Sequence, residues 1–234
     1  LTPLYLLMLT KKTIMYIKRI YLIILILSPL HILAQNQADS VKITKLLNQV
    51  NVNALRAGDK TPVTFTNISK SEIENVNLGQ DMPYMISLTP SVVTTSDAGA
   101  GIGYTGFRIR GSDPTRINVT INGIPLNDSE SQGVWWVNMP DLSSSIENIH
   151  IQRGVGTSTN GGSAFGASVN LQTDKSNAKP YLTTNNTVGS FATLKNNIQF
   201  GTGLLNNKFV FDGRLSRIVS DGYIDRASSE LKSM

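Results

Sequence analysis

Side chains that could carry acid–base, metal or nucleophilic chemistry are few in this 234-residue sequence. It contains no cysteine and two histidines, and His31 falls in an apolar run near the start, which leaves His150. A Ser–His–Asp triad, a thiolate nucleophile and a Cys- or multi-His-ligated metal site are therefore poorly supported. Asp128, Glu130 and Asp141 lie among Ser, Asn and Gly residues, without apolar neighbours that would raise a pKa. We expect solvated loop acids and no catalytic site.

Two further sequence patterns resemble ligand sites but lack the structural context that such sites need. Residues 101–106, Gly-Ile-Gly-Tyr-Thr-Gly, have the spacing of a dinucleotide-binding loop, which must be followed by a helix N-terminus. An alternating segment, residues 107–110, follows instead, so we expect a mobile glycine-rich loop between strands and no bound cofactor. His150 stands between two isoleucines, which predicts a solvent-facing strand residue rather than a metal ligand.

Two Arg-Gly pairs have chemistry suited to contacts with another surface. Arg110-Gly111 and Arg153-Gly154 each place an arginine at the end of an alternating segment, beside a glycine that permits a sharp turn. A carboxylate on another surface holds such an arginine best, in a bidentate pair. Solvated charges at strand ends are the alternative.

The Trp135-Trp136 pair supports two hypotheses equally. The rings could form a rigid aromatic surface for a ligand or a wall contact. They could also pack within the domain, and consecutive residues on a strand point to opposite faces.

The elements that position these side chains are short. A capping box at residues 69–72 predicts a helix over 70–76. Asp81 caps a second predicted helix over 82–88, which Pro90 ends. Alternation with a period of two predicts strands at residues 107–110, 117–121, 124–126, 149–152 and 167–171. An Asn-Gly pair makes the second and third of them a hairpin. Short helices and strands without a βαβ rhythm indicate an α+β domain over 67–175.

Longer alternating segments occupy residues 180–234. They cover 181–188, 192–200 and 209–218. Segments of about ten alternating residues joined by tight turns are typical of an outer-membrane barrel. Three strands cannot close a barrel and the sequence stops at Met234 in polar residues, so we expect a fragment.

The first 34 residues have the pattern of a targeting signal. Residues 15–34 combine a basic start, an apolar stretch and a small residue at Ala34, which predicts a secretory signal peptide cut near that position. Proline and histidine interrupt the run before it reaches the roughly 20 residues of a membrane-spanning anchor. The chain begins with leucine, so we expect Met8 or Met15 as the true start.

The charge balance excludes a nucleic-acid binder. Four of the 21 basic residues precede residue 35, where there are no acids, which leaves 17 basic against 16 acidic side chains. This near-neutral balance lacks the excess of positive charge that binding to a nucleic acid requires. Residues 35–66 are polar without sustained periodicity and predict an extended arm.

Taken in order, five strings resemble the plug of TonB-dependent outer-membrane receptors. They are a TonB box at 47–56, an "IRG" element at 107–111, a "DG-I-P" hairpin at 121–127, an "IE-IE-RG" element at 146–154 and a "YG-A-GG-VINI" element at 161–171. Asn122 and Phe165 replace the usual Asp and Tyr. The resemblance covers residues 47–225.

The resemblance implies an α+β plug domain with a small mixed sheet and short helices. The first antiparallel strands of a truncated transmembrane β-barrel of about 22 strands would follow. It implies no enzyme but an outer-membrane receptor that takes up a scarce nutrient of the iron–siderophore, haem or cobalamin class. A glycan importer of the same family, and a truncated plug that binds TonB without transporting, are the alternatives.

The resemblance also implies partners and contact residues. TonB, with its ExbB–ExbD motor, would add a strand at Gln49, Val50, Asn51, Val52 and Asn53. Polar plug–barrel contacts would come from Arg110, Gly111, Glu147, Arg153 and Gly154. Outward loops at 95–104 and 127–138 would bind the nutrient through Tyr104, Asn127, Asp128, Trp135 and Trp136. Outer-membrane lipid and a surface lipoprotein complete the expected partners, with no metal or cofactor.

Overall fold

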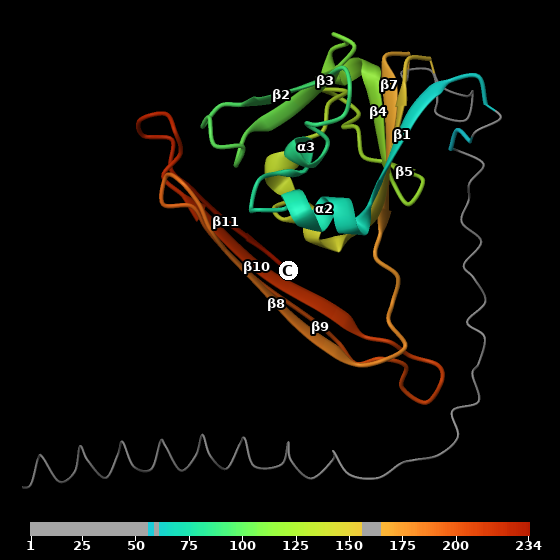
Figure 1. The fold of residues 1–234 in the computed structure, drawn as a ribbon, viewed down its shortest axis with the longest axis vertical. Coiled ribbons are helices and arrows are strands. Elements are labelled where there is room, and N and C mark those ends of the chain that lie inside the picture. Colours follow the sequence, from blue (N-terminus) through green and yellow to red (C-terminus); the bar gives the residue numbers. More distant parts are fainter. Residues whose placement is uncertain (1–55, 59–60, 156–164) are drawn as a thin grey trace, which may run out of the picture. The chain divides into compact units, whose positions relative to one another are not determined.

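The computed structural model describes residues 56–58, 61–155 and 165–234 (Figure 1). The predicted signal peptide and the predicted TonB box at 47–55 lie outside the described residues. The chain divides into Leu1–Val50 and Asn51–Met234, and the second unit holds every element below.

A five-stranded mixed sheet forms the centre of the first domain. Its spatial order is β1 (Thr64–Ser69), β6 (Ile146–Arg153), β7 (Ala167–Thr173), β4 (Ile117–Ile121) and β5 (Ile124–Pro125). β4 runs parallel to β7, and the other neighbours are antiparallel. Asn122 and Gly123, both at positive φ, make the predicted hairpin turn between β4 and β5. The final residues of the predicted arm lie in β1, a strand that alternation did not predict.

Short helices and a hairpin cover one face of this sheet (Figure 1). They are α2 (Lys70–Val76), α3 (Met82–Met85), β2 (Val92–Ser96), β3 (Thr105–Ile109), and the 3₁₀ turns η3 (Pro114–Arg116), η4 (Trp136–Asn138) and η5 (Leu142–Ser145). The predicted capping box is present, since the Ser69 N–H donates to Glu72 Oε2 at 2.7 Å. A glycine-rich loop joins β2 to β3 as expected, but the strand begins at Thr105, so the last two residues of the predicted loop, 105 and 106, lie in β3.

Helix α3 is shorter than the predicted 82–88 helix. The backbone N–H and the hydroxyl of Ser87 both donate to the Tyr84 carbonyl, at 3.2 and 2.8 Å. These contacts close a turn where an α-helix would continue, because Ser competes with the backbone for hydrogen bonds.

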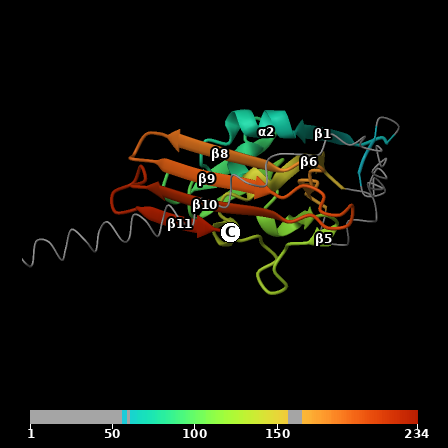
Figure 2. The same ribbon diagram turned by 90° about the horizontal axis from the view of Figure 1, so that it is seen from below.

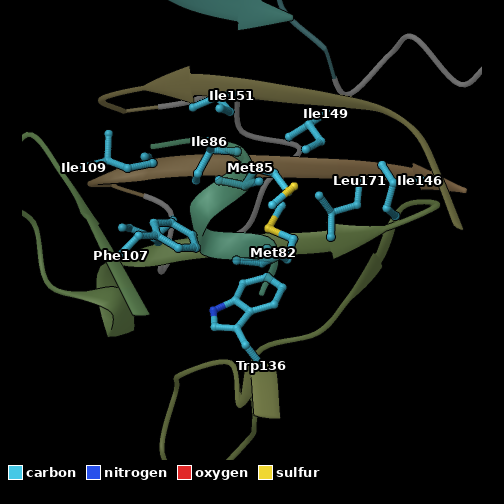
Figure 3. Packing of buried hydrophobic residues seen from close by; sticks show 14 of the residues in the cluster. Met82, Met85, Ile86, Phe107, Ile109, Trp136, Ile146, Ile149, Ile151 and Leu171 are labelled. Atoms are coloured by element: carbon cyan, nitrogen blue, oxygen red, sulfur yellow. The ribbon is translucent and has the colours of Figure 1, made fainter. Parts of the chain in front are cut away.

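The hydrophobic core lies between the sheet and these helices (Figure 3). Ile149 and Ile151 of β6 point into it, and Met82 of α3 packs beside Phe107 and Trp136. The Phe107 and Trp136 ring centroids are 5.9 Å apart. Alternation along β6 therefore sends Ile149 and Ile151 to the core and Asn148, His150 and Gln152 to the opposite face, and a register shift between Ile146 and Asn148 lets Ile146 reach the core as well.

A second sheet follows, with four antiparallel strands side by side (Figure 2). These are β8 (Tyr181–Val188), β9 (Leu194–Gly201), β10 (Asp212–Ser220) and β11 (Ser229–Ser233). The first three match the predicted alternating segments, whereas β11 and β2 were not predicted. Among the described residues, no helix has the length and apolarity needed to span a membrane.

Candidate functional site

A buried carboxylate joins the first domain to the four-stranded sheet. Asp141 precedes η5 in the left-handed region, with φ at 53°, and its side chain is fully buried. Oδ1 lies 2.7 Å from Lys195 Nζ and accepts from Ser144 Oγ at 2.6 Å. Oδ2 accepts from Asn197 Nδ2 and from Ser216 Oγ, each at 2.6 Å. Both carboxylate oxygens of Asp141 therefore have their hydrogen-bonding capacity filled by donors.

Strands β9 and β10 supply most of these donors from one face. Lys195 and Asn197 alternate along β9, and Ser216 of β10 pairs in register with Asn197. Arg214 of β10 lies 3.3 Å from Asp141 Oδ2 and also donates to the Asp141 carbonyl. The Lys195 ammonium also donates to Asn77 Oδ1 of the first domain at 2.8 Å. We call this group of six residues the Asp141 seat: Asp141, Ser144, Lys195, Asn197, Arg214 and Ser216.

The Asp141 seat corrects the expectation of a solvated loop acid at this position. Burial alone raises the pKa of Asp141, but the attraction of Lys195 and the hydrogen bonds from Lys195, Ser144 and Ser216 outweigh it, so the pKa lies below its ordinary value. The group is therefore a carboxylate at neutral pH. Asp128 and Glu130 are exposed, as expected. The sequence could not reveal the seat, because all of its donors except Ser144 come from strands more than 50 residues along the chain.

Strands β8, β9 and β10 place large apolar side chains on the face opposite the Asp141 seat. The large exposed apolar residues there are Leu182, Val188, Leu194, Ile198 and Leu215. In β9, Lys195 is 2% exposed whereas its neighbour Leu194 is 45% exposed. This inverts the pattern of a water-soluble sheet, in which polar residues face solvent and apolar residues face the interior.

Four of the five predicted plug–barrel residues lie near one another at one end of the mixed sheet, and Glu147 lies at the opposite end of β6. An Arg110 Nη atom is 3.5 Å from Thr64 Oγ1, and Arg153 donates to the Pro90 carbonyl at 3.3 Å. Gly111 and Gly154 have positive φ, and a Cβ on Gly154 would lie 3.0 Å from the Arg110 guanidinium. Neither arginine forms an ion pair within the part of the chain that the structure describes. Their pairing with carboxylates elsewhere stays a prediction, as does that of the half-buried Glu147.

The predicted ligand residues separate into two groups. A cavity of about 460 Å³ is lined by Tyr104, Trp135 and Trp136, together with Phe107 and Arg108. Trp136 is 4% exposed and packs in the core, whereas Trp135 is 52% exposed, and its contact with a ligand stays a prediction.

Asn127 and Asp128 do not line this cavity. The Asn127 amide instead accepts from the Val119 N–H and donates to the Ile117 and Gln132 carbonyls, at 2.8 to 2.9 Å. Asp128 accepts from the backbone N–H of Ser131 at 2.7 Å. These contacts shape the loop that carries Trp135.

His150 is buried, and the prediction of a solvent-facing residue is wrong. Its Nε2 accepts from the Ala57 N–H at 3.2 Å, and its Nδ1 lies 2.6 Å from Asn67 Oδ1. Burial, with a smaller effect of the Arg56 charge, lowers its pKa to about 4. Alternation assigned His150 to the correct face, but it cannot tell whether another segment covers that face. Across the described residues, no group of three His, Asp or Glu side chains could hold a metal ion.

A mixed-sheet domain that contacts the polar face of an antiparallel sheet through a buried ion pair has the architecture expected of a receptor plug. Residues 57–168 match the family model described as TonB-dependent Receptor Plug Domain. The chain thus carries a TonB-dependent receptor plug domain, and this plug family is not enzymatic.

Solved structures share this fold. FpvA of Pseudomonas aeruginosa, solved with heterologous pyoverdines, has a TM-score of 0.55 and 15% identity over 69% of this chain. The alcaligin outer-membrane receptor FauA of Bordetella pertussis gives 0.56 and 16% over 69%, and the ferric yersiniabactin uptake receptor FyuA of Yersinia pestis gives 0.51 and 13% over 68%. The match covers only 21% of FpvA, 27% of FauA and 24% of FyuA. No curated protein sequence matches the chain.

Proposed function

We propose that this chain belongs to a TonB-dependent outer-membrane receptor for active uptake of a scarce nutrient of the iron–siderophore, haem or cobalamin class. The observation that carries the proposal is the Asp141 seat on a sheet with inverted polarity. A plug domain contacts the polar face of that sheet, and its opposite face exposes Leu194, Ile198 and Leu215. Such strands suit a barrel whose lumen is filled by protein and whose outer surface meets lipid.

In this proposal, β8–β11 are the first strands of a barrel of about 22 strands. The protein would reach the outer membrane through the periplasm after removal of its signal peptide near Ala34. Arg110, Glu147 and Arg153 would meet later parts of the barrel wall. Ion pairs of this kind suit a plug that must loosen, because water re-solvates separated charges whereas it penalises exposed apolar surface.

Energy would come from TonB and its ExbB–ExbD motor. Residues 47–55 would add to a TonB sheet as a strand, through backbone hydrogen bonds that tolerate the polar side chains of Asn51 and Asn53. The adjoining residues Arg56 and Ala57 contact the plug domain directly, so tension on the box would reach the plug at once.

The cavity beside Trp135 is the proposed nutrient contact within the plug. The iron class is favoured because the similar receptors FpvA, FauA and FyuA act with pyoverdine, alcaligin and ferric yersiniabactin respectively. The half-exposed Trp135 ring favours glycan import as a second candidate, since an aromatic face with a polar edge stacks well on a sugar.

Deletion of residues 47–55 from the full-length protein tests this function. Cells that depend on this receptor would be supplied with labelled ferric siderophores, haem, cobalamin or oligosaccharides. We expect the deletion to abolish uptake and to spare binding of the same ligand at the cell surface. Val52→Pro should act likewise because it removes a backbone donor, whereas Val52→Thr keeps that donor and should transport normally. Uptake retained by the deletion variant would refute the TonB-box assignment.

A further inference from the structure

The mixed sheet has a polar face on the side opposite its hydrophobic core. His150 of β6 pairs in register with Asn67 of β1 and with Asn170 of β7, so the three side chains form a row across the strands. Their neighbours Ile149 and Ile151 point into the core (Figure 3). All the groups in this row can exchange hydrogen bonds.

A short segment before β1 lies on this polar face. Arg56 donates to Asn148 Oδ1 at 2.6 Å, and the Ala57 N–H donates to His150 Nε2 at 3.2 Å. The Phe65 ring stacks on the imidazole, with centroids 5.5 Å apart. Ala57 is 6% exposed and His150 is fully buried, so the segment shields the imidazole from water. We call the contacts of Arg56 and Ala57 with Asn148 and His150 the His150 clasp.

The His150 clasp requires a neutral imidazole. Because Nε2 accepts from Ala57, the ring proton sits on Nδ1 and donates to Asn67 Oδ1 at 2.6 Å. An imidazolium carries N–H groups on both nitrogens and would turn an N–H toward the Ala57 N–H. The described groups that pack against the ring are Arg56, Ala57, Phe65, Asn67 and Asn170. Of these, only Arg56 is charged, and its positive charge opposes a second one on the ring.

We propose that the His150 clasp is a proton-sensitive latch. It holds the segment entering the plug while His150 is neutral, and it releases that segment when His150 takes up a second proton. The latch is a property of the plug alone. Its consequence, acid-enhanced access to residues 47–55 just upstream, rests on the proposed function.

The size of the effect follows from proton linkage. The closed clasp holds the pKa of His150 at about 4, whereas the pKa of an unhindered imidazole is about 6.5. The open form therefore binds protons more tightly, and acid favours opening. Between pH 8 and pH 5 the ratio of open to closed clasp should rise by up to about thirty-fold.

Hydrogen exchange in the full-length protein, purified in detergent, tests the latch without TonB or ligand. Exchange of the peptide covering residues 56–63 would be followed by mass spectrometry from pH 8 to pH 5, with rates corrected for the intrinsic pH dependence of amide exchange. We expect its protection to fall by up to about thirty-fold, while residues 117–126 of the β4–β5 hairpin keep theirs. His150→Gln retains an acceptor oxygen that cannot be protonated in this range, so its protection should not change with pH.

Two results would overturn the proposal. One is a corrected exchange rate that does not change with pH in the native protein, and the other is equal acceleration in His150→Gln. If that variant misfolds, the ¹⁵N chemical shifts of the His150 ring in the native protein test the proposal, because they report its protonation state and tautomer. A neutral ring with the proton on Nδ1 at pH 7 supports the latch, and a ring that titrates near 6.5 without loss of Ala57 protection refutes it.

Discussion

Asp141→Asn should destabilise the plug strongly. The variant preserves the shape of the side chain but removes its charge, so Lys195, whose side chain is 1% exposed, keeps a buried ammonium without its carboxylate. The Asn amide also turns a donor toward Asn197 or Ser216, which donate to the native carboxylate. Removal of one partner from a buried ion pair costs about 3–5 kcal/mol. The cost arises mostly from the stranded charge.

Urea unfolding of the full-length protein, read by hydrogen exchange of the plug peptides, measures this cost. With a urea dependence of about 1–3 kcal/mol per molar, the unfolding midpoint should fall by at least about 1 M. The matched control is Glu74→Gln, the same kind of neutralisation at an exposed position on α2, which should cost no more than about 0.5 kcal/mol.

The double variant Asp141→Asn/Lys195→Met isolates the cause. Methionine keeps much of the lysine stem, which packs near Gly79, but it carries no charge. If the stranded ammonium is responsible, the double variant should be more stable than Asp141→Asn alone. Two results would refute this explanation. One is a double variant less stable than Asp141→Asn, and the other is an Asp141→Asn midpoint equal to that of Glu74→Gln.

Two further predictions use the same unfolding assay. Burial raises the pKa of Asp81 to about 6, so the folded plug binds a proton that the unfolded chain has lost, and stability should fall as the pH rises from about 4 to 6. Asp81→Asn should therefore raise the midpoint at pH 7 and leave it nearly unchanged at pH 4; an equal shift at both would contradict this. Trp136→Ala removes a core ring and should cost about 3–5 kcal/mol. Trp135→Ala should leave the midpoint nearly unchanged but weaken nutrient binding, and the reverse pattern would exchange the roles of the two rings.

Local rules predicted the elements of this protein well. The capping box at Ser69 and the Asn122-Gly123 hairpin depend on residues within four positions of each other, and both form as predicted. The alternation in β4, β6, β7 and β9 also predicted which side chains share a face, because successive residues in a strand point in opposite directions. The weakly patterned strands β1, β2 and β11 escaped prediction, since their pairing partners rather than their own sequences make them strands.

The capped helix, the hairpin, the faces of the patterned strands and the order of the plug motifs follow from neighbours along the chain, so local sequence predicts them. What covers each face depends instead on contacts between distant segments. Asp141 is buried because Lys195, Asn197 and Ser216 arrive from strands 54 to 75 residues later, and His150 is buried because Ala57 crosses from 93 residues earlier. The environment of a titratable group depends on such distant partners, and solvation by water or by protein decides its charge.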